Sequence, residues 1–315
     1  MSTSPGTSPS TSAGAGALAY RPRRSVLYMP AANERALEKA RAIPADALIL
    51  DLEDAVAPDA KDAARERACA KVAERAYGGR EVTIRVNALD TRWHADDLRA
   101  AAAAGPDAVV VPKISCAQDV HAVEKSLQAA GAPDHTRIWA MVETPVAMLH
   151  AEEIARASQR LAVLVMGTND LANELHAEHV PGRAPLLPGL GLCLLAARAA
   201  GVAILDGVFN DIRDLAGFEA ECLQGRQLGF DGKTLIHPGQ VEPCNRAFAP
   251  TDVQTEESRN IVAVWEEALA AGRGVATVNG RMIENLHVDN ARRIIAVSQA
   301  IEELDREAAA RAASQ

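Results

Sequence analysis

Two carboxylates in this sequence stand at the ends of apolar runs. Glu143 closes the run 137–143 ("RIWAMVE"), and Pro145 then stops that strand from continuing. Asp170 lies just past a similar run, 161–167 ("LAVLVMG"). Mg²⁺ in proteins is held by one or two carboxylates, with water and substrate oxygens completing its coordination. Glu143 and Asp170 are therefore candidate Mg²⁺ ligands, with two alternatives: each could pair with a nearby cation, and Asp170 could cap the helix that it opens.

Polar residues follow the other apolar runs as well. Arg85 is a candidate clamp for a substrate carboxylate, because a planar guanidinium binds a carboxylate through two hydrogen bonds. The alternative for Arg85 is an ion pair with Asp51 or Glu53. The remaining polar residues of this kind are Asp54, Asn87, Lys113, Asp206, Asn210 and His237.

The elements that must position these residues are eight short, mostly continuous apolar runs. Continuous apolar runs are typical of parallel strands covered on both faces. Ala-rich segments with helical spacing lie between them, so the pattern predicts an α/β fold, a (β/α)₈ TIM barrel. A doubly wound open sheet is the alternative, but no G-x-G-x-x-G follows the first run. The runs are 25–30, 47–53, 81–87, 108–113, 137–143, 161–167, 202–207 and 232–238.

The chain divides into three expected parts. Residues 1–20 are rich in Ser, Thr, Gly, Pro and Ala and are expected to form a disordered tail. Residues 21–248 are expected to form the catalytic barrel, and residues 249–315 a C-terminal helical region. This region is too long to be only the last barrel helix, so we expect it to act as a lid or an oligomer element. Its expected parts are a helix, a hairpin or strand–turn piece, and a charged helix, at 255–272, 274–286 and 288–312.

The composition narrows the class of protein. A formal net charge of −9 argues against a nucleic-acid or membrane-surface partner, which would normally require a basic excess. Five scattered cysteines without a CxxC pair indicate reduced thiols in a cytoplasmic protein. No apolar segment approaches the roughly 18–20 residues that span a bilayer, and the opening residues have neither a secretory nor an Arg-rich transit pattern. We therefore expect a cytoplasmic protein that acts on a small molecule.

Several motifs together resemble the citrate lyase β-subunit-like (HpcH/HpaI aldolase) family of CoA-ester lyases. The resemblance runs from about residue 21 to residue 300. It implies a TIM barrel with an extra C-terminal part, dependence on Mg²⁺ with Mn²⁺ as a substitute, and coenzyme A as part of the substrate. Members include malyl-CoA and citramalyl-CoA lyases and malyl-CoA thioesterases. The motifs are "RRSVLYMPAANERALEKA", "ALILDLEDAV", "TIRVN", "MVETPVAM", "GTNDLANEL" and "GFDGKTLIHPGQV".

The resemblance also implies roles for particular residues. Glu143 and Asp170 would hold Mg²⁺, Glu143 would also contact the substrate, and Arg85 would bind the carboxylate of the 2-oxo acid. It implies a homotrimer or hexamer in which the C-terminal part closes over a neighbour's site. The expected catalytic residues are Glu284, Arg85 and Asp51, and the expected CoA-binding residues are Arg23, Arg24 and Ser25.

One position departs from the lyase pattern. Lyases of this family carry the acid–base Asp in a C-terminal "G-x-M-I-D" segment, whereas this chain reads "GRMIENLHV" and places Glu284 there. Glu is one methylene longer, and a small displacement of a catalytic group can cost a large factor in rate. A carboxylate displaced from the enolate carbon could instead orient a water at the thioester.

Two activities follow. The first is a Mg²⁺-dependent lyase that cleaves or forms the C–C bond of a 3-hydroxyacyl-CoA such as malyl-CoA or citramalyl-CoA, giving an acetyl-CoA-type thioester and a 2-oxo acid. The alternative is a (3S)-malyl-CoA thioesterase that uses the same site. A non-catalytic binding subunit is disfavoured by the full set of Arg85, Glu143, Asp170 and Glu284, and a pyruvate aldolase without CoA is disfavoured by the basic residues 21–24.

Overall fold

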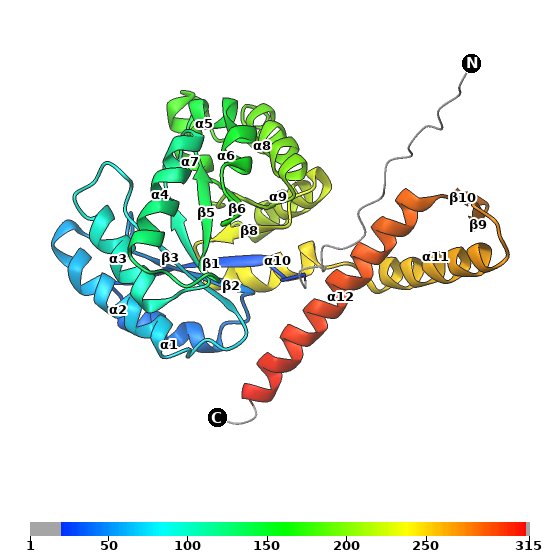
Figure 1. Ribbon diagram of the computed structural model, residues 1–315, viewed down its shortest axis with the longest axis horizontal. Coiled ribbons are helices and arrows are strands. Elements are labelled where there is room, and N and C mark those ends of the chain that lie inside the picture. Colours follow the sequence, from blue (N-terminus) through cyan, green and yellow to red (C-terminus); the bar gives the residue numbers. More distant parts are fainter. Residues whose placement is uncertain (1–19, 313–315) are drawn as a thin grey trace, which may run out of the picture.

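The computed structural model describes residues 20–312 and shows a closed barrel of eight parallel strands in chain order, with β1 paired to β8 (Figure 1). This confirms the predicted (β/α)₈ barrel. The tail expected at 1–20 lies, but for its last residue, outside the described residues. The strands are β1 (Ser25–Pro30), β2 (Ala47–Asp51), β3 (Glu81–Arg85), β4 (Ala108–Val111), β5 (Arg137–Val142), β6 (Leu161–Met166), β7 (Ala203–Asp206) and β8 (Gly232–Leu235).

Helices surround the barrel. Asn33 caps the first helix, because its side-chain oxygen accepts a hydrogen bond from the Ala36 N–H at 3.1 Å. Gly105 ends the helix at 94–104 and Gly201 ends the helix at 187–200. Their φ angles are positive, 66° and 72°, a conformation that favours glycine. The helices are α1 (Glu34–Lys39), α2 (Lys61–Ala73), α3 (His94–Ala104), α4 (Ala117–Ala129), α5 (Pro145–Leu149), α6 (Ala151–Arg156), α7 (Thr168–Glu174), α8 (Leu187–Ala200), α9 (Leu215–Leu228) and α10 (Val241–Phe248), with 3₁₀ turns η1 (Ala40–Ala42), η2 (Pro58–Ala60) and η3 (Pro238–Gln240).

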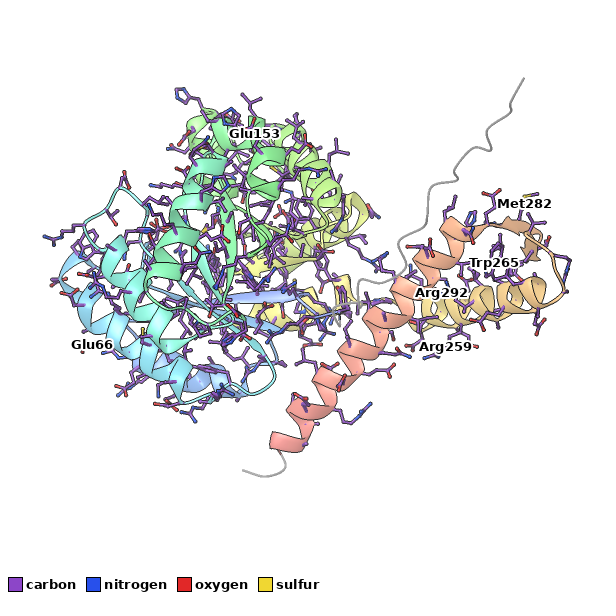
Figure 2. The ribbon with its side chains drawn as sticks, viewed as in Figure 1. Glu66, Glu153, Arg259, Trp265, Met282 and Arg292 are labelled. Carbon is purple, nitrogen blue, oxygen red and sulfur yellow. The ribbon has the colours of Figure 1, made fainter. Side chains whose placement is uncertain are left out.

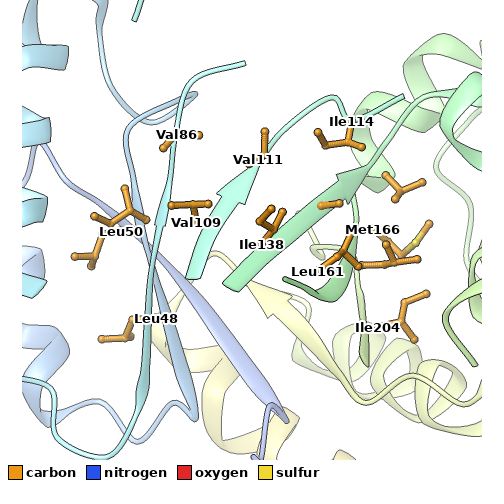
Figure 3. Close-up of a cluster of buried hydrophobic side chains, with 14 of the residues drawn as sticks. Leu48, Leu50, Val86, Val109, Val111, Ile114, Ile138, Leu161, Met166 and Ile204 are labelled. Atoms are coloured by element: carbon orange, nitrogen blue, oxygen red, sulfur yellow. The ribbon is translucent and has the colours of Figure 1, made fainter. Parts of the chain in front are cut away.

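Most strands are largely apolar because both of their faces are buried, although β3 and β8 also carry buried polar residues such as Glu81, Thr83 and Lys233. Side chains that point outward pack against the helices and form the main core, to which Leu48, Leu50 and Val109 belong (Figure 3). Side chains that point inward fill the barrel, as Ile49 and Val110 do. Successive residues of a strand therefore enter two different cores, which explains why most of the strands lack an apolar–polar alternation.

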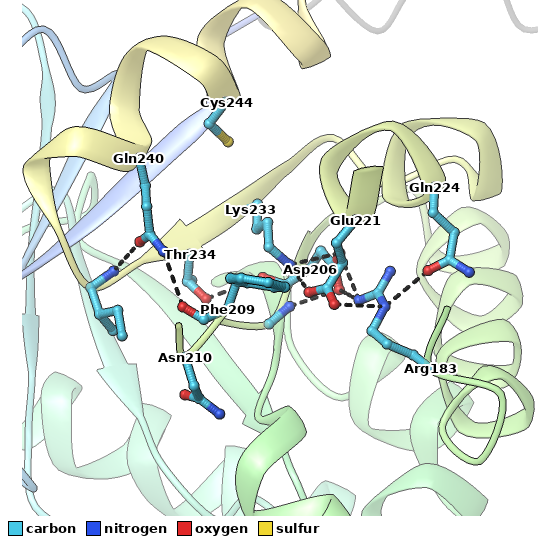
Figure 4. A network of polar contacts seen from close by, with 12 residues as sticks. Arg183, Asp206, Phe209, Asn210, Glu221, Gln224, Lys233, Thr234, Gln240 and Cys244 are labelled. Atoms are coloured by element: carbon cyan, nitrogen blue, oxygen red, sulfur yellow. Dashed lines mark hydrogen bonds and ion pairs between the residues drawn. The ribbon is translucent and has the colours of Figure 1, made fainter. Parts of the chain in front are cut away.

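A buried charge network ties the last two strands to α9 and to the loop before α8 (Figure 4). Lys233 Nζ donates to Asp206 at 3.1 Å and to Glu221 at 2.7 Å, and Arg183 Nη1 donates to Asp206 at 2.7 Å. Burial opposes the charge of Asp206, but Lys233 and Arg183 outweigh it and hold the pKa of this carboxyl below its usual value. Asp206, predicted among the polar residues at the strand ends, thus serves the fold.

The C-terminal region is an arm that projects from the barrel, with Met282 and Trp265 at its far part (Figures 1 and 2). A small core of its own joins Trp265, Ala276 and Ile283. The last helix of the arm runs back to the barrel, where its residue Asp305 contacts Arg24, just before β1, at 3.2 Å. Its elements are α11 (Asp252–Ala270), β9 (Ala276–Val278), β10 (Arg281–Ile283) and α12 (Asn285–Ala312).

No helix between residues 20 and 312 combines the length and the apolar character that crossing a membrane requires.

Candidate active site

A cavity of about 360 Å³ opens at the carboxyl ends of the strands, which we call the mouth of the barrel. Five of the predicted residues line it: Asp51 at the end of β2, Asp54 in the loop that follows, Arg85 at the end of β3, Glu143 just after β5, and Asp170 in α7 after β6. They come from separate parts of the chain and meet because parallel strands place all their carboxyl ends at one side of a barrel. The other lining residues are Tyr28, Pro30, Ala55, Met141, Met166, Gly167, Thr168, Asn169, Val208, Thr234 and Ile236.

Glu143 is held almost entirely out of solvent. Its Oε1 accepts a hydrogen bond from the backbone N–H of Lys113 at 2.7 Å, and Lys113 has a positive φ of 55°. Gly167 passes so close that a Cβ there would lie 2.2 Å from Glu143 Cβ. Burial and then the nearby charge of Asp170 raise the pKa of Glu143 to about 7. A buried carboxylate beside a like charge is stabilised by a cation.

Asp170 supplies the second carboxylate of the pair. The helix that contains it, α7, takes Gly167 as its N-cap, and Asp170 makes no side-chain capping bond. Among residues 20–312 its carboxylate takes part in no ion pair or side-chain hydrogen bond, and its charge acts on Glu143. The two alternatives considered for this residue, a helix cap and an ion pair, are therefore not what the structure contains.

The donor set fits a hard divalent ion. No group of three or more His, Cys, Asp and Glu residues is arranged for a metal in the described part of the chain. An ion at Glu143 and Asp170 would thus take two protein carboxylates and fill its other positions with water and substrate oxygens. This is the usual manner of Mg²⁺.

Arg85 is paired within the mouth, as the alternative interpretation of this residue predicts. Its Nε and Nη2 donate to the two oxygens of Asp51, both at 2.7 Å, and its Nη1 lies 2.8 Å from Glu53. The ring of Tyr28 lies under the guanidinium, 4.8 Å from centroid to Cζ. Burial opposes the charge of Arg85, but Asp51 outweighs it, so the pKa of Arg85 lies well above its usual value.

Sequence reasoning missed several residues of the mouth. Tyr28 and Thr234 lie inside strands, where only the alternation of side chains could have marked them as pointing toward the cavity. Asn169 forms a reciprocal pair of amide hydrogen bonds with Asn210, at 3.1 and 2.8 Å. This pair joins the first turn of α7 to the loop after β7 and braces the turn that carries Asp170.

The structure does not bring Arg23, Arg24 and Ser25 to the mouth. They lie at the amino end of β1, whose six residues span roughly 20 Å. Arg23 pairs with Glu81 at 2.6 Å and Arg24 with Asp46 at 2.8 Å, while Ser25 is fully buried. The chain enters the barrel from the end opposite the cavity, so these side chains stabilise that end and we do not carry them into the proposed site.

Glu284 is not at the mouth of its own barrel either. It lies between β10 and α12 on the arm, two residues after Met282, which Figure 2 labels in the far part of the arm. Its backbone N–H donates to His287 Nδ1 at 3.1 Å. Within one chain Glu284 is therefore separated from Glu143 and Asp170, and the predicted catalytic role of Glu284 requires a second copy.

Comparisons with known proteins add to this geometry. The family model for HpcH/HpaI aldolase/citrate lyase matches residues 24–238. The chain is similar to a (3S)-malyl-CoA thioesterase of Cereibacter sphaeroides strain KD131, with 51% identity over 280 residues, 89% of this chain and 96% of the relative. It is also similar to the citrate lyase subunit beta of Escherichia coli strain K12, with 39% identity over 87% of this chain and 93% of the relative. Among solved structures, protein CitE of Mycobacterium tuberculosis in complex with magnesium, acetoacetate and coenzyme A matches with a TM-score of 0.71 and 29% identity, over 87% of this chain and 97% of that one.

Proposed function

The chain belongs to the HpcH/HpaI aldolase/citrate lyase family, and on that basis we propose that it is a Mg²⁺-dependent thioesterase. The expected substrate is a 3-hydroxyacyl-CoA that carries a second, free carboxylate, with (3S)-malyl-CoA as the first to test. One observation carries the proposal: Glu143, Asp170 and Arg85 share one cavity in a chain that is 51% identical to a (3S)-malyl-CoA thioesterase.

The charge of the mouth supports a metal-dependent reaction on an anion. Among the described residues, four carboxylates and a single guanidinium line the cavity: Asp51, Asp54, Glu143, Asp170 and Arg85. An anionic substrate is repelled by such a site until a divalent cation occupies it. When bound, Mg²⁺ would supply a Lewis acid for the substrate's oxygens.

The chain's own residues bind and orient the substrate. Arg85 takes the free carboxylate, and Asp51 and Tyr28 fix the plane of its guanidinium. Apolar side chains such as Met141 and Met166 limit water around the acyl chain. Hydrolysis then forms a bond between a water oxygen and the thioester carbon and breaks the C–S bond, and the thiol of CoA leaves with a proton.

We assign the task of orienting that water to Glu284 of a neighbouring copy. The arm places Glu284 away from its own barrel, and an exposed hairpin at the end of two helices can reach a second barrel. A homotrimer or hexamer with the arm as lid is therefore part of the proposal. A cytoplasmic location and the use of Mn²⁺ in place of Mg²⁺ belong to it as well.

A C–C lyase is the second candidate, favoured by the 39% identity to a citrate lyase subunit beta. In that reaction the bond between the α-carbon of the thioester and the hydroxyl-bearing carbon breaks. The products are a 2-oxo acid and a thioester enolate, which then takes a proton at carbon. Both reactions need the same two metal-binding carboxylates, Glu143 and Asp170, and the same arginine, Arg85. They differ in whether a water molecule reaches the thioester.

One assay separates the two reactions. Purified protein is incubated with Mg²⁺ and malyl-CoA, and glyoxylate and free thiol are measured in the same sample. Thiol without glyoxylate supports the thioesterase, and glyoxylate without thiol establishes the lyase. Neither product, from malyl-CoA or from other 3-hydroxyacyl-CoAs, contradicts both. Chelation with EDTA should stop turnover, and added Mg²⁺ or Mn²⁺ should restore it.

A further inference from the structure

The guanidinium of Arg85 has two edges that can each bind a carboxylate through two hydrogen bonds. Asp51 fills one of them, with Nε and Nη2 each donating at 2.7 Å. The other edge, formed by Nη1 and Nη2, is where a substrate carboxylate would bind. In this structure Nη1 already contacts Glu53 at 2.8 Å and Asp54 at 3.3 Å.

These three acids are held very differently. Asp51 also accepts hydrogen bonds from the backbone N–H groups of Glu53 at 2.9 Å and Ala55 at 3.2 Å, so it is fixed at both oxygens. Glu53 and Asp54 reach Arg85 through one oxygen each. The side chain of Asp54 is 74% exposed and that of Glu53 is 12% exposed, and each is held by fewer contacts than the carboxylate of Asp51.

We propose that Glu53, assisted by Asp54, is a resident competitor for the substrate's free carboxylate at Nη1 of Arg85. Resident competitor here means a side chain that pairs with Arg85 before the substrate binds and is displaced when the substrate binds. The inference rests on the proposed function, because it needs a substrate with a free carboxylate, and it names the residues that select for that group.

Charge balance is the reason for an exchange. A fourth carboxylate at one guanidinium is repelled by the three already present, whereas replacing one carboxylate by another leaves the charge at Arg85 unchanged. Until the substrate binds, Glu53 prevents Arg85 from being a buried, half-paired cation. An acyl-CoA without a free carboxylate cannot replace Glu53 at Arg85, so Arg85 adds nothing to its binding affinity.

The environment of Glu53 favours the incoming group. Burial raises the pKa of Glu53 to about 7, although the charge of Arg85 opposes the rise. The Glu53 carboxylate is thus costly to keep ionised in place, while a substrate carboxylate arrives fully ionised. The exchange releases Glu53 toward solvent, where its charge is hydrated.

The test compares three variants by calorimetric titration with (S)-malate at saturating Mg²⁺. Glu53→Gln should lower the Kd for malate about fivefold, because the amide is a weaker partner for Arg85. Asp54→Asn should lower it less, since its contact is longer and exposed. Asp59→Asn, an exposed acid of η2 on the same loop, is the matched control and should leave the Kd unchanged. The Kd for malamide, the uncharged diamide of malate, should be the same in every variant.

Kinetics with malyl-CoA give a second measurement. Glu53→Gln should lower KM and leave kcat within about twofold of the original value. A large loss of kcat at constant KM would make Glu53 a catalytic proton carrier and overturn the inference, as would an unchanged or weaker affinity for malate. If Glu53→Gln does not fold, Glu53→Asp, which withdraws the carboxylate by one methylene, should give a smaller gain in affinity, and no gain again overturns it.

The two proposals fail separately. If Glu53→Gln binds malate more tightly but the protein never turns over malyl-CoA, the result contradicts the proposed thioesterase and supports the exchange at Arg85. Turnover of malyl-CoA together with an unchanged malate Kd in Glu53→Gln contradicts the exchange alone. Absence of malate binding in every form contradicts the exchange as well.

Discussion

At the scale of single residues, the mouth of the barrel is a place where burial and like charges are concentrated. Glu143 is 2% exposed and faces the charge of Asp170, and burial together with Asp170 outweighs the opposing charges of Arg85 and Lys113 at its carboxyl. Stability alone does not favour such an arrangement, because an uncompensated buried charge is costly. A divalent ion resolves the conflict, which is why we assign these two residues to the metal.

Removal of either carboxylate should abolish metal-dependent turnover. Glu143→Gln and Asp170→Asn are each expected to lower kcat by about a hundredfold or more, because the ion would lose one of its two protein ligands. Mg²⁺ titration followed by calorimetry should show weaker binding in both. Glu124→Gln, on α4 and outside the cavity, is the control. Full activity in Glu143→Gln would remove that residue from the metal site.

Gly167 is expected to be essential for steric reasons. A Cβ there would lie 2.2 Å from Glu143 Cβ and 2.3 Å from Oε2, although the φ of Gly167 is an ordinary −94°. Gly167→Ala should therefore displace Glu143, lower the melting temperature and reduce activity. Gly191→Ala, in α8 with nothing within 4 Å of the added Cβ, should keep activity and gain about 0.5–1 kcal/mol of helix stability. Equal behaviour of the two variants would contradict the steric argument.

At the scale of elements, the site depends on turns that directly follow strands and on the contacts that hold them. The Asn169–Asn210 amide pair joins α7 to the β7–α9 loop, and the Asp206 network joins β7 and β8 to α9. The network is balanced, with Arg183 and Lys233 opposite Asp206 and Glu221. It holds the strands whose carboxyl ends form one side of the mouth.

Breaking this network should cost stability in a way that depends on pH. Asp206→Asn leaves Lys233 and Arg183 without their shared carboxylate, which should lower the free energy of unfolding by about 3 kcal/mol at neutral pH. The pKa of Asp206 lies below its usual value of 3.8, so its contribution is present above that pH and is lost as the pH falls through the lower value of the folded state. The urea midpoint measured over a series of pH values should fall less steeply in acid for Asp206→Asn than for the parent protein.

One control variant and the response of the network in alkali sharpen this prediction. Asp211→Asn changes an acid of the same β7–α9 loop whose side chain is 57% exposed, and it should leave the urea midpoint unchanged. The pKa of Lys233 is raised above its usual value of 10.5, since Asp206 and Glu221 outweigh the effect of burial. The contribution of Lys233 is therefore complete below that pH and is lost only in stronger alkali. An identical acid response in Asp206→Asn and the parent would contradict the role of the network.

At the scale of the whole molecule, one chain holds the mouth and the arm apart. The arm keeps its own small core around Trp265, and α12 is fastened to the amino end of the barrel through Asp305 and Arg24. Glu284 and Glu143 can therefore act in one reaction only across two copies. The proposed oligomer follows from this separation.

Complementation between variants tests that arrangement. Glu143→Gln and Glu284→Gln should each be nearly inactive alone, whereas co-expression of the two should restore part of the activity, because some mouths receive an intact arm from the other variant. Sedimentation analysis should show a trimer or hexamer. Recovery should be absent if both changes are placed in the same chain. Failure of the mixed preparation to recover, with the oligomer intact, would show that Glu284 does not act across copies.

Much of the fold could be predicted because its signals are local. Each of the eight apolar runs contains an observed strand, and helices such as α4 are observed in the Ala-rich segments between the runs. The ends differ by a few residues because strand pairing stops where the chain turns to the mouth, as after Asp51 and Val142. Since closed parallel strands share one mouth, the sequence could also predict that Glu143, Asp170 and Arg85 lie together.

The sequence by itself determined the order of strands and helices and the acids that stand at strand ends, because apolar periodicity and strand length are properties of short segments. Only the tertiary structure decided which partner each charge takes. It pairs Arg85 with Asp51 and Glu53, places Arg23 and Arg24 at the end opposite the cavity, and carries Glu284 away on the arm. These choices depend on closure of the barrel and on the path of the chain around it, which bring together residues far apart in sequence.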